Sequence, residues 1–148
     1  MIGKALAKKI RDGDRVYGTC TVSPSPGWVN AITPANPDFV FIDTEHNSLD
    51  RTQVGWMCRT YAALGIVPIV RITSADPHLA SSTIDDGALG IVAPYIETVE
   101  QVDGLRGAVK HRPLKGGRLT DRLSGKRVSK EIDEYIINRN ANNVLILN

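Results

Sequence analysis

The chain has 148 residues, a net charge of +2, 42% hydrophobic residues and 23% charged residues. This length suffices for one domain with its own core, and the average globular composition excludes a disordered chain or a coiled coil. The small net charge creates no field that would recruit nucleic acid or a membrane surface, and no run approaches the roughly 20 apolar residues of a bilayer-spanning helix. We therefore expect a cytoplasmic protein that acts on small molecules.

Short apolar runs alternate with longer segments of helical period along the chain. The predicted strands are residues 16–22, 39–43, 67–72, 89–93 and 144–147. The predicted helices are residues 50–64, 78–86, 98–111 and 129–140, of which the third begins with a capping box formed by Thr98 and Gln101. This alternation is typical of βαβ units around a parallel sheet.

The two cysteines, Cys20 and Cys58, lie in or near these elements and have neither C-x-x-C nor Cys/His spacing. They are predicted to be reduced, buried thiols, and a disulfide framework or a zinc site is not indicated. The N-terminal residues 1–18 interleave cations with apolar residues and do not resemble a signal peptide.

Residues 112–129 are predicted to form a long loop, because glycine and proline interrupt every helical period there. This region and the end of the preceding helix carry many cations: Arg106, Lys110, Arg112, Lys115, Arg118, Arg122, Lys126 and Arg127. They indicate either a solvated or subunit-contact surface or an anion site.

The polar residues that follow the strands decide between an open sheet and a barrel. The first strand runs into Ser23-Pro24-Ser25-Pro26-Gly27 and not into the G-x-G-x-x-G turn of a nucleotide-binding sheet. Polar groups instead follow several different strands, as in the top face of a (β/α)8 barrel. We therefore predict an α/β fold of the (β/α)8 TIM-barrel type, with residues 1–148 forming one partial domain of about five βα units that ends at the fifth strand.

An apolar strand delivers Asp43, Glu45 and His46 into one loop, and a carboxylate beside an imidazole suits acid/base chemistry near neutral pH. The alternative is a surface loop with an incidental histidine. Arg71 closes the next strand, where a buried cation needs an anion. That anion is either a substrate carboxylate or enolate, which fits the planar guanidinium, or a protein carboxylate such as Asp43, Glu45 or Asp85.

These segments together resemble the 4-hydroxy-2-oxoheptanedioate aldolases and macrophomate synthase, which belong to the metal-dependent aldolases of the phosphoenolpyruvate/pyruvate barrels. The resemblance covers nearly the whole chain in order. It rests on the runs FIDTEH from Phe41, VRI from Val70, IDDGALGIVAP from Ile84 and ETVEQ from Glu97.

The resemblance implies a site and a reaction. His46 would be the acid/base residue with Asp43 as its dyad partner, Arg71 would bind the pyruvate oxygen and stabilise the enolate, and Asp85 would be a second carboxylate near the site. Asn148 would contact substrate where the family commonly has Gln. The implied activity is a class II aldolase, a lyase that cleaves or forms 4-hydroxy-2-oxo acids from a 2-oxo acid and an aldehyde, with Mg, Mn or Co as the divalent metal.

The family holds its metal with carboxylates that follow the fifth and sixth strands, beyond Asn148, so we expect no metal ligands among these residues. A homo-oligomer, or a complementing second half, would then complete the barrel. Two alternatives remain: a catalytically incomplete remnant or assembly module of the same family, and a citrate-lyase-type C–C lyase of the same superfamily.

Overall fold

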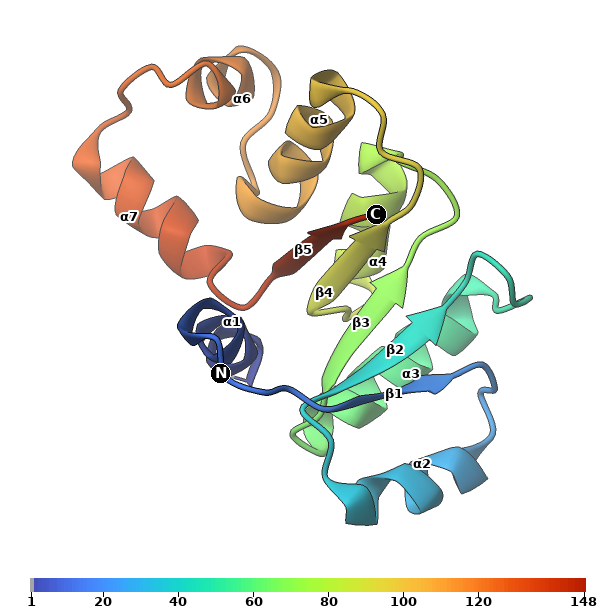
Figure 1. Cartoon of the computed structure of the whole chain (residues 1–148). Coiled ribbons are helices and arrows are strands. Elements are labelled where there is room, and N and C mark those ends of the chain that lie inside the picture. Colours follow the sequence, from blue (N-terminus) through green and yellow to red (C-terminus); the bar gives the residue numbers. More distant parts are fainter. Residues whose placement is uncertain (1) are drawn as a thin grey trace.

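The computed structural model describes residues 2–148, which form a five-stranded parallel sheet with helices between the strands (Figure 1). The strands are β1 (Gly18–Thr21), β2 (Phe39–Asp43), β3 (Val67–Arg71), β4 (Gly90–Ala93) and β5 (Val144–Leu147). The helices are α1 (Ile2–Asp12), α2 (Pro26–Ile32), α3 (Arg51–Ala63), α4 (Pro77–Asp85), α5 (Val99–Lys110), α6 (Gly116–Leu123) and α7 (Lys130–Arg139), and a short 3-10 turn η1 (Thr33–Ala35) precedes β2.

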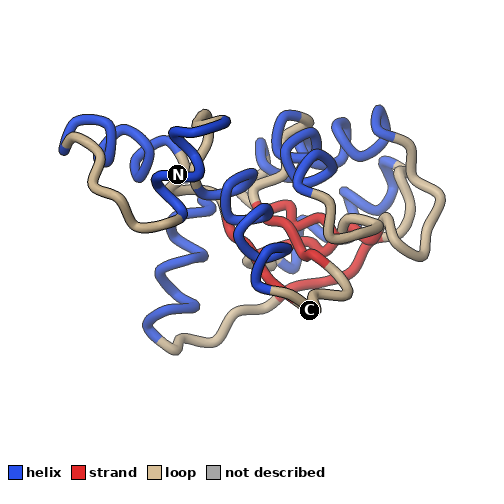
Figure 2. The backbone as a smooth tube through the Cα atoms, turned by 90° about the horizontal axis from the view of Figure 1, so that it is seen from above, coloured by secondary structure: helices blue, strands red, loops and turns tan. Residues whose placement is uncertain are grey.

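The strands pair in their sequence order, β1-β2-β3-β4-β5, and every pairing is parallel. Figure 2 shows them side by side as one continuous layer. A doubly wound open sheet reverses its strand order at a switch point, and this sheet has no such reversal. The topology therefore confirms the prediction of a TIM-barrel-type arrangement with five βα units.

The helices predicted from their caps and apolar stripes are present. Asp50 and Thr98 each form a capping box with the residue three positions later, at the starts of α3 and α5. Each box satisfies backbone groups that the first helical turn leaves unpaired. Residues 129–140 form α7 with Ser129 as its N-cap, and His78–Asp86 corresponds to α4.

Two cores lie on opposite faces of the sheet, because successive strand residues point to opposite faces. One core packs β2, β3 and β4 against α3, α4 and α5, and includes Met57, Tyr61 and Leu105, each at most 1% exposed. Burying each such side chain stabilises the fold by about 1.5–3 kcal/mol. On the other face, Leu6 of α1 packs against Val67, Ile69 and Val92, so α1 covers the end of the sheet where the strands begin.

Three helices are absent from the sequence-based prediction. Residues 112–129 are not one loop, because α6 covers Gly116–Leu123. Its Leu119 fits against Gly107 of α5, where an added Cβ would lie 2.9 Å from Leu119 Cδ2. This contact between α5 and α6 stabilises a helix that the local glycine-rich sequence does not predict. Helices α1 and α2 were likewise not predicted, since cations or prolines interrupt their apolar pattern.

The expectation of two buried cysteines is correct for Cys58 and wrong for Cys20, which is exposed. Cys20 lies opposite Phe41 in the β1–β2 register, on the face of the sheet that α3, α4 and α5 do not cover. Within residues 2–148, no helix combines the length and the hydrophobicity that crossing a membrane requires.

Candidate active site

The candidate site is built around Arg71, the last residue of β3. Its neighbour in the β2–β3 register is Asp43, the last residue of β2. Arg71 donates from Nε to Asp43 Oδ1 at 2.9 Å and from Nη2 to Asp43 Oδ2 at 2.8 Å, while its Nη1 lies 3.0 Å from Glu45 Oε2. The two-point contact with Asp43 fixes the orientation of the guanidinium plane, as such paired bonds do.

The backbone and an aromatic ring also position Arg71. Thr44 Oγ1 and the Thr44 N–H both donate to the carbonyl of Arg71, at 2.6 and 3.2 Å. The guanidinium carbon lies 5.6 Å from the centre of the Phe41 ring, within the range of a cation–π contact. The Arg71 side chain keeps 20% of its surface exposed, so it is not fully shielded from solvent.

The pairing with Arg71 shifts the pKa of Asp43. The hydrogen bonds from Arg71 lower the pKa of Asp43 below its ordinary value of 3.8, against the opposing effect of burial. Asp43 is therefore ionised near neutral pH. Two carboxylates, Asp43 and Glu45, face one guanidinium, and both carboxylate side chains are only 8% exposed.

His46 lies at the open rim of this cluster. Its side chain is 63% exposed, and Nε2 lies 3.7 Å from Glu45 Oε2. The oxygens of Asp43 accept hydrogen bonds from Arg71, from Asn47 Nδ2 and from the Glu45 N–H. Among the described residues Asp43 thus pairs with Arg71 and not with the imidazole, and the Asp43–His46 dyad stays a prediction.

Glu45 is a member of the cluster that the sequence places in the same loop and offers as a possible partner of Arg71, without a catalytic role of its own. Glu45 contacts Arg71, and its Oε2 lies 3.7 Å from Nε2 of His46. It also interacts with Tyr95, whose pKa is raised mainly by a hydrogen bond to Glu45. Tyr95 follows β4 and adopts a left-handed φ of 56°, which is uncommon outside glycine. The available signal was the position of Glu45, two residues beyond the end of the strand that delivers Asp43.

The other two predicted site residues, Asp85 and Asn148, form no hydrogen bond or ion pair with Arg71 among the described residues. Asp85 is the last residue of α4, just before the beginning of β4, whereas Arg71 lies at the end of β3. Asp85 is exposed and pairs with Arg112. Asn148 follows β5 directly, where its backbone bonds Ala93 and Ile96, and it is exposed. The structure therefore brings together Asp43, Arg71 and His46 through Glu45, and it does not bring Asp85 to them.

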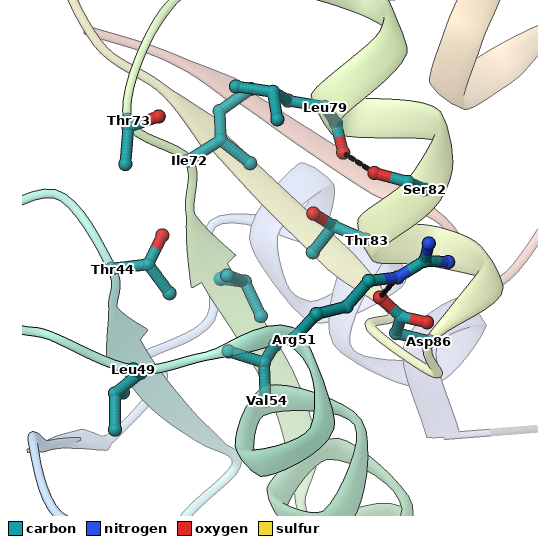
Figure 3. A pocket seen from close by; sticks show the side chains of 11 residues that line it. Thr44, Leu49, Arg51, Val54, Ile72, Thr73, Leu79, Ser82, Thr83 and Asp86 are labelled. Atoms are coloured by element: carbon teal, nitrogen blue, oxygen red, sulfur yellow. Dashed lines mark hydrogen bonds and ion pairs between the residues drawn. The ribbon is translucent and has the colours of Figure 1, made fainter.

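A small cavity lies behind this cluster, between α3, α4 and the sheet (Figure 3). It has a volume of about 190 Å³. Hydroxyls from Thr44, Thr73 and Thr83 meet apolar side chains there, and an ion pair between Arg51 and Asp86 lies at one end. Because Asp43, Arg71 and His46 are not part of its lining, this cavity is separate from the candidate site.

Comparison with known proteins finds aldolases among the similar sequences. No protein-family model matches the chain. A 2-dehydro-3,6-dideoxy-6-sulfogluconate aldolase from Pseudomonas putida is 29% identical over 97 residues, which cover 66% of this chain and 38% of the relative. A pyruvate aldolase from Rhizobium etli is 28% identical over 106 residues, which cover 72% of this chain and 42% of the relative.

Solved structures extend the likeness to nearly the whole chain. An HpcH/HpaI aldolase from Desulfitobacterium hafniense superposes with a TM-score of 0.73 at 22% identity, over 96% of this chain and 55% of that one. Macrophomate synthase superposes with a TM-score of 0.63 at 25% identity, over 98% of this chain and 52% of that one. The chain thus spans about two fifths of the length of these relatives and about half of these solved chains.

Proposed function

We propose that this chain, which is similar to a pyruvate aldolase and to an HpcH/HpaI aldolase, carries the anion-binding and proton-transfer part of such an active site. The reaction would cleave or form 4-hydroxy-2-oxo acids through the enolate of pyruvate, with a 2-oxo acid and an aldehyde as substrates. The single observation that carries the proposal is the placement of Arg71. Its guanidinium is oriented by Asp43 at the carboxyl end of the sheet, where barrel enzymes hold their substrates.

The contacts of Arg71 suggest how an anionic substrate would bind. Asp43 occupies Nε and Nη2 and holds the guanidinium in place, whereas Glu45 contacts only Nη1. A substrate carboxylate or enolate oxygen would displace Glu45 from Nη1 and leave the Asp43 pair intact. Arg71 would then stabilise the negative charge that develops when the enolate forms, which is how preorganised donors accelerate such steps.

His46 is the group in this cluster that can exchange a proton with a substrate near neutral pH. Its imidazole is exposed at the rim, so a bound substrate can reach it. We propose that His46 acts as the general acid/base residue, with Glu45 and Asp43 supplying negative charge beside it. Asp85 is the less favoured member of the predicted set, because its carboxylate is paired with Arg112.

A divalent cation, Mg, Mn or Co, is part of the proposal only through the family resemblance. Residues 2–148 contain no group of three or more His, Cys, Asp or Glu side chains placed to hold a metal ion. The residues described therefore do not form a metal site, and none of the steps above is assigned to a metal.

The proposal is tested by measuring pyruvate release from 4-hydroxy-2-oxo acids, with and without each of the three cations. Arg71→Met should lower kcat/KM by about 10²–10³-fold, as loss of an oxyanion donor does. His46→Gln should lower kcat by about 10²–10⁴-fold, as loss of a general acid/base does. His78→Gln is the matched control, because His78 is an exposed histidine at the start of α4, and it should leave turnover unchanged.

The same assay distinguishes the second candidate, a catalytically incomplete module of the family. The observation that favours it is that all three nitrogens of Arg71 already contact protein carboxylates, as in a purely structural ion pair. Absence of pyruvate release under every cation, with Arg71→Met lowering only stability, would support this module and overturn the aldolase proposal.

Assembly is a further part of the proposal. The edge strands β1 and β5 have no strand partner on their outer sides among the described residues, and Ile146 and Leu147 of β5 are 38% and 42% exposed. Unpaired edges and exposed apolar side chains favour association. We propose that a homo-oligomer or a complementing polypeptide covers them, which light scattering over a range of concentrations would detect.

A further inference from the structure

A cluster of basic residues surrounds a crevice at the end of the sheet opposite Arg71. Its walls include Lys4 and Arg11 of α1, Lys110 and His111 at the end of α5, and Arg122 of α6. We call these five residues and the space between them the basic crevice. Its volume is about 340 Å³, and no Asp or Glu of the described chain lines it.

The crevice lies where strands begin and not where they end. Lys110 Nζ donates to the carbonyl of Asn143, the residue before β5, at 2.6 Å. The N–H of Lys4 donates to Asn142 Oδ1 in the same turn, at 3.0 Å. Figure 1 shows α1 beside the end of α7 that leads into β5. The basic crevice is therefore separate from the candidate active site.

A neighbouring cavity of about 370 Å³ shares His111 and Arg122 with the crevice and adds three cations, Arg106, Lys126 and Arg127, to the lining. Its only acidic lining residue among those described is Asp133, which pairs with Arg122. The two cavities thus form adjoining parts of one strongly cationic surface.

Several of these cations lack a counter-charge within residues 2–148. Lys4 and Arg11 form no ion pair with a described carboxylate, and Lys110 bonds a neutral carbonyl. Burial, followed by the charges of Arg122, Arg106 and Lys110, lowers the pKa of His111. Burial, followed by the charge of Arg11, likewise lowers the pKa of Lys110. The fold therefore holds like charges close enough to repel one another.

Helix dipoles explain only part of this arrangement. The negative ends of α5 and α7 lie at the crevice and favour cations such as Lys110. Lys4, however, lies in the first turn of α1, where the helix dipole disfavours a cation. An external anion would offset the repulsion that the dipoles leave.

We propose that the basic crevice binds a small molecule that carries a phosphate group. Side chains from α1, α5 and α6 converge on one compact volume, which favours a ligand that concentrates its charge. A phosphoryl group places up to two negative charges and three acceptor oxygens on one atom, and the planar guanidinium of an arginine such as Arg11 can bond two of those oxygens. The volume is that of a pocket for a small ligand.

The test uses inorganic pyrophosphate as the probe and calorimetry at constant ionic strength. Arg11→Gln and Lys4→Gln should each weaken binding by about 5–10-fold, the effect of about 1–1.4 kcal/mol. Both side chains are exposed, so the fold should survive, which circular dichroism checks. Lys8→Gln is the matched control on the same helix, since Lys8 pairs with Asp12 and does not line the crevice; it should leave the affinity unchanged.

A second readout needs no variant. The His111 pKa, held low by burial and by the surrounding cations, should rise when pyrophosphate binds, as followed by NMR titration of the imidazole. An unchanged His111 pKa, an equal loss of affinity in Lys8→Gln, or the same heat with chloride at matched ionic strength would each overturn the proposal. None of these measurements depends on aldolase activity.

Discussion

The pairing of Asp43 with Arg71 should be measurable as stability. Asp43→Asn removes one of the two charges and leaves Nη2 of Arg71 facing an amide. Removing one partner of a fully buried ion pair costs about 3–5 kcal/mol. Here the Arg71 side chain is 20% exposed and Glu45 remains 3.0 Å from Nη1, so we expect the lower figure of about 2–3 kcal/mol.

This loss can be followed by urea unfolding with circular dichroism at pH 7. With a slope of about 1–3 kcal/mol per molar urea, the midpoint should fall by about 0.7–3 M with the slope unchanged. Asp14→Asn changes an exposed aspartate that forms no ion pair with a described residue, and it should shift stability by less than about 0.5 kcal/mol.

The pH dependence gives an independent check. Because Asp43 has a lower pKa in the folded protein than its ordinary value of 3.8, its contribution to stability is fully present above that value and is lost as pH falls through the folded-state pKa. The difference between the native protein and Asp43→Asn should therefore shrink in acid. A difference no larger than that of Asp14→Asn at pH 7, or one that grows in acid, would refute this account of the pair.

Three further predictions concern packing and the thiols. Met57→Ala should destabilise the protein by about 2–5 kcal/mol in the same urea assay, because Met57 is 0% exposed and the change leaves a cavity. Gly3→Ala should lower stability by about 1–3 kcal/mol, because its Cβ would lie 2.0 Å from the carbonyl oxygen of Asn142 and push α1 away from the turn before β5. An unchanged urea midpoint would contradict this contact between α1 and the turn. An aromatic disulfide reagent at pH 8 should modify Cys20 in the folded protein and Cys58 only after unfolding, because Cys58 is buried and burial raises its pKa to about 12. Rapid modification of both thiols in the folded protein would contradict the burial of Cys58.

The strands and the capped helices could be predicted from the sequence because their signals are local. Residues 39–43 and 144–147 form strands with the predicted bounds, and the Thr98–Gln101 capping box marks the true start of α5. Helix α6 has no comparable local signal. It is held by Leu119 against Gly107 of α5, a contact between segments that only the folded chain brings together.

In the candidate site, too, some features could be predicted from the sequence and others depend on the folded chain. Parallel strands end at one edge of a sheet, so Asp43 and Arg71 could be placed near each other before the register was known. Register and side-chain direction decide the rest. They place Glu45 at Nη1 of Arg71, and they place Asp85 at the end of a helix beside Arg112. The roles of these residues in catalysis stay predictions.

The central claim, that this cluster promotes the enolate of pyruvate, is tested most directly by exchange of the pyruvate methyl protons in D₂O, followed by ¹H NMR with Mg, Mn or Co present. Our account predicts exchange above the buffer rate that is lost in Arg71→Met and in His46→Gln and retained in His78→Gln. Exchange that persists in Arg71→Met and His46→Gln, or no exchange with any of the three cations, would contradict it.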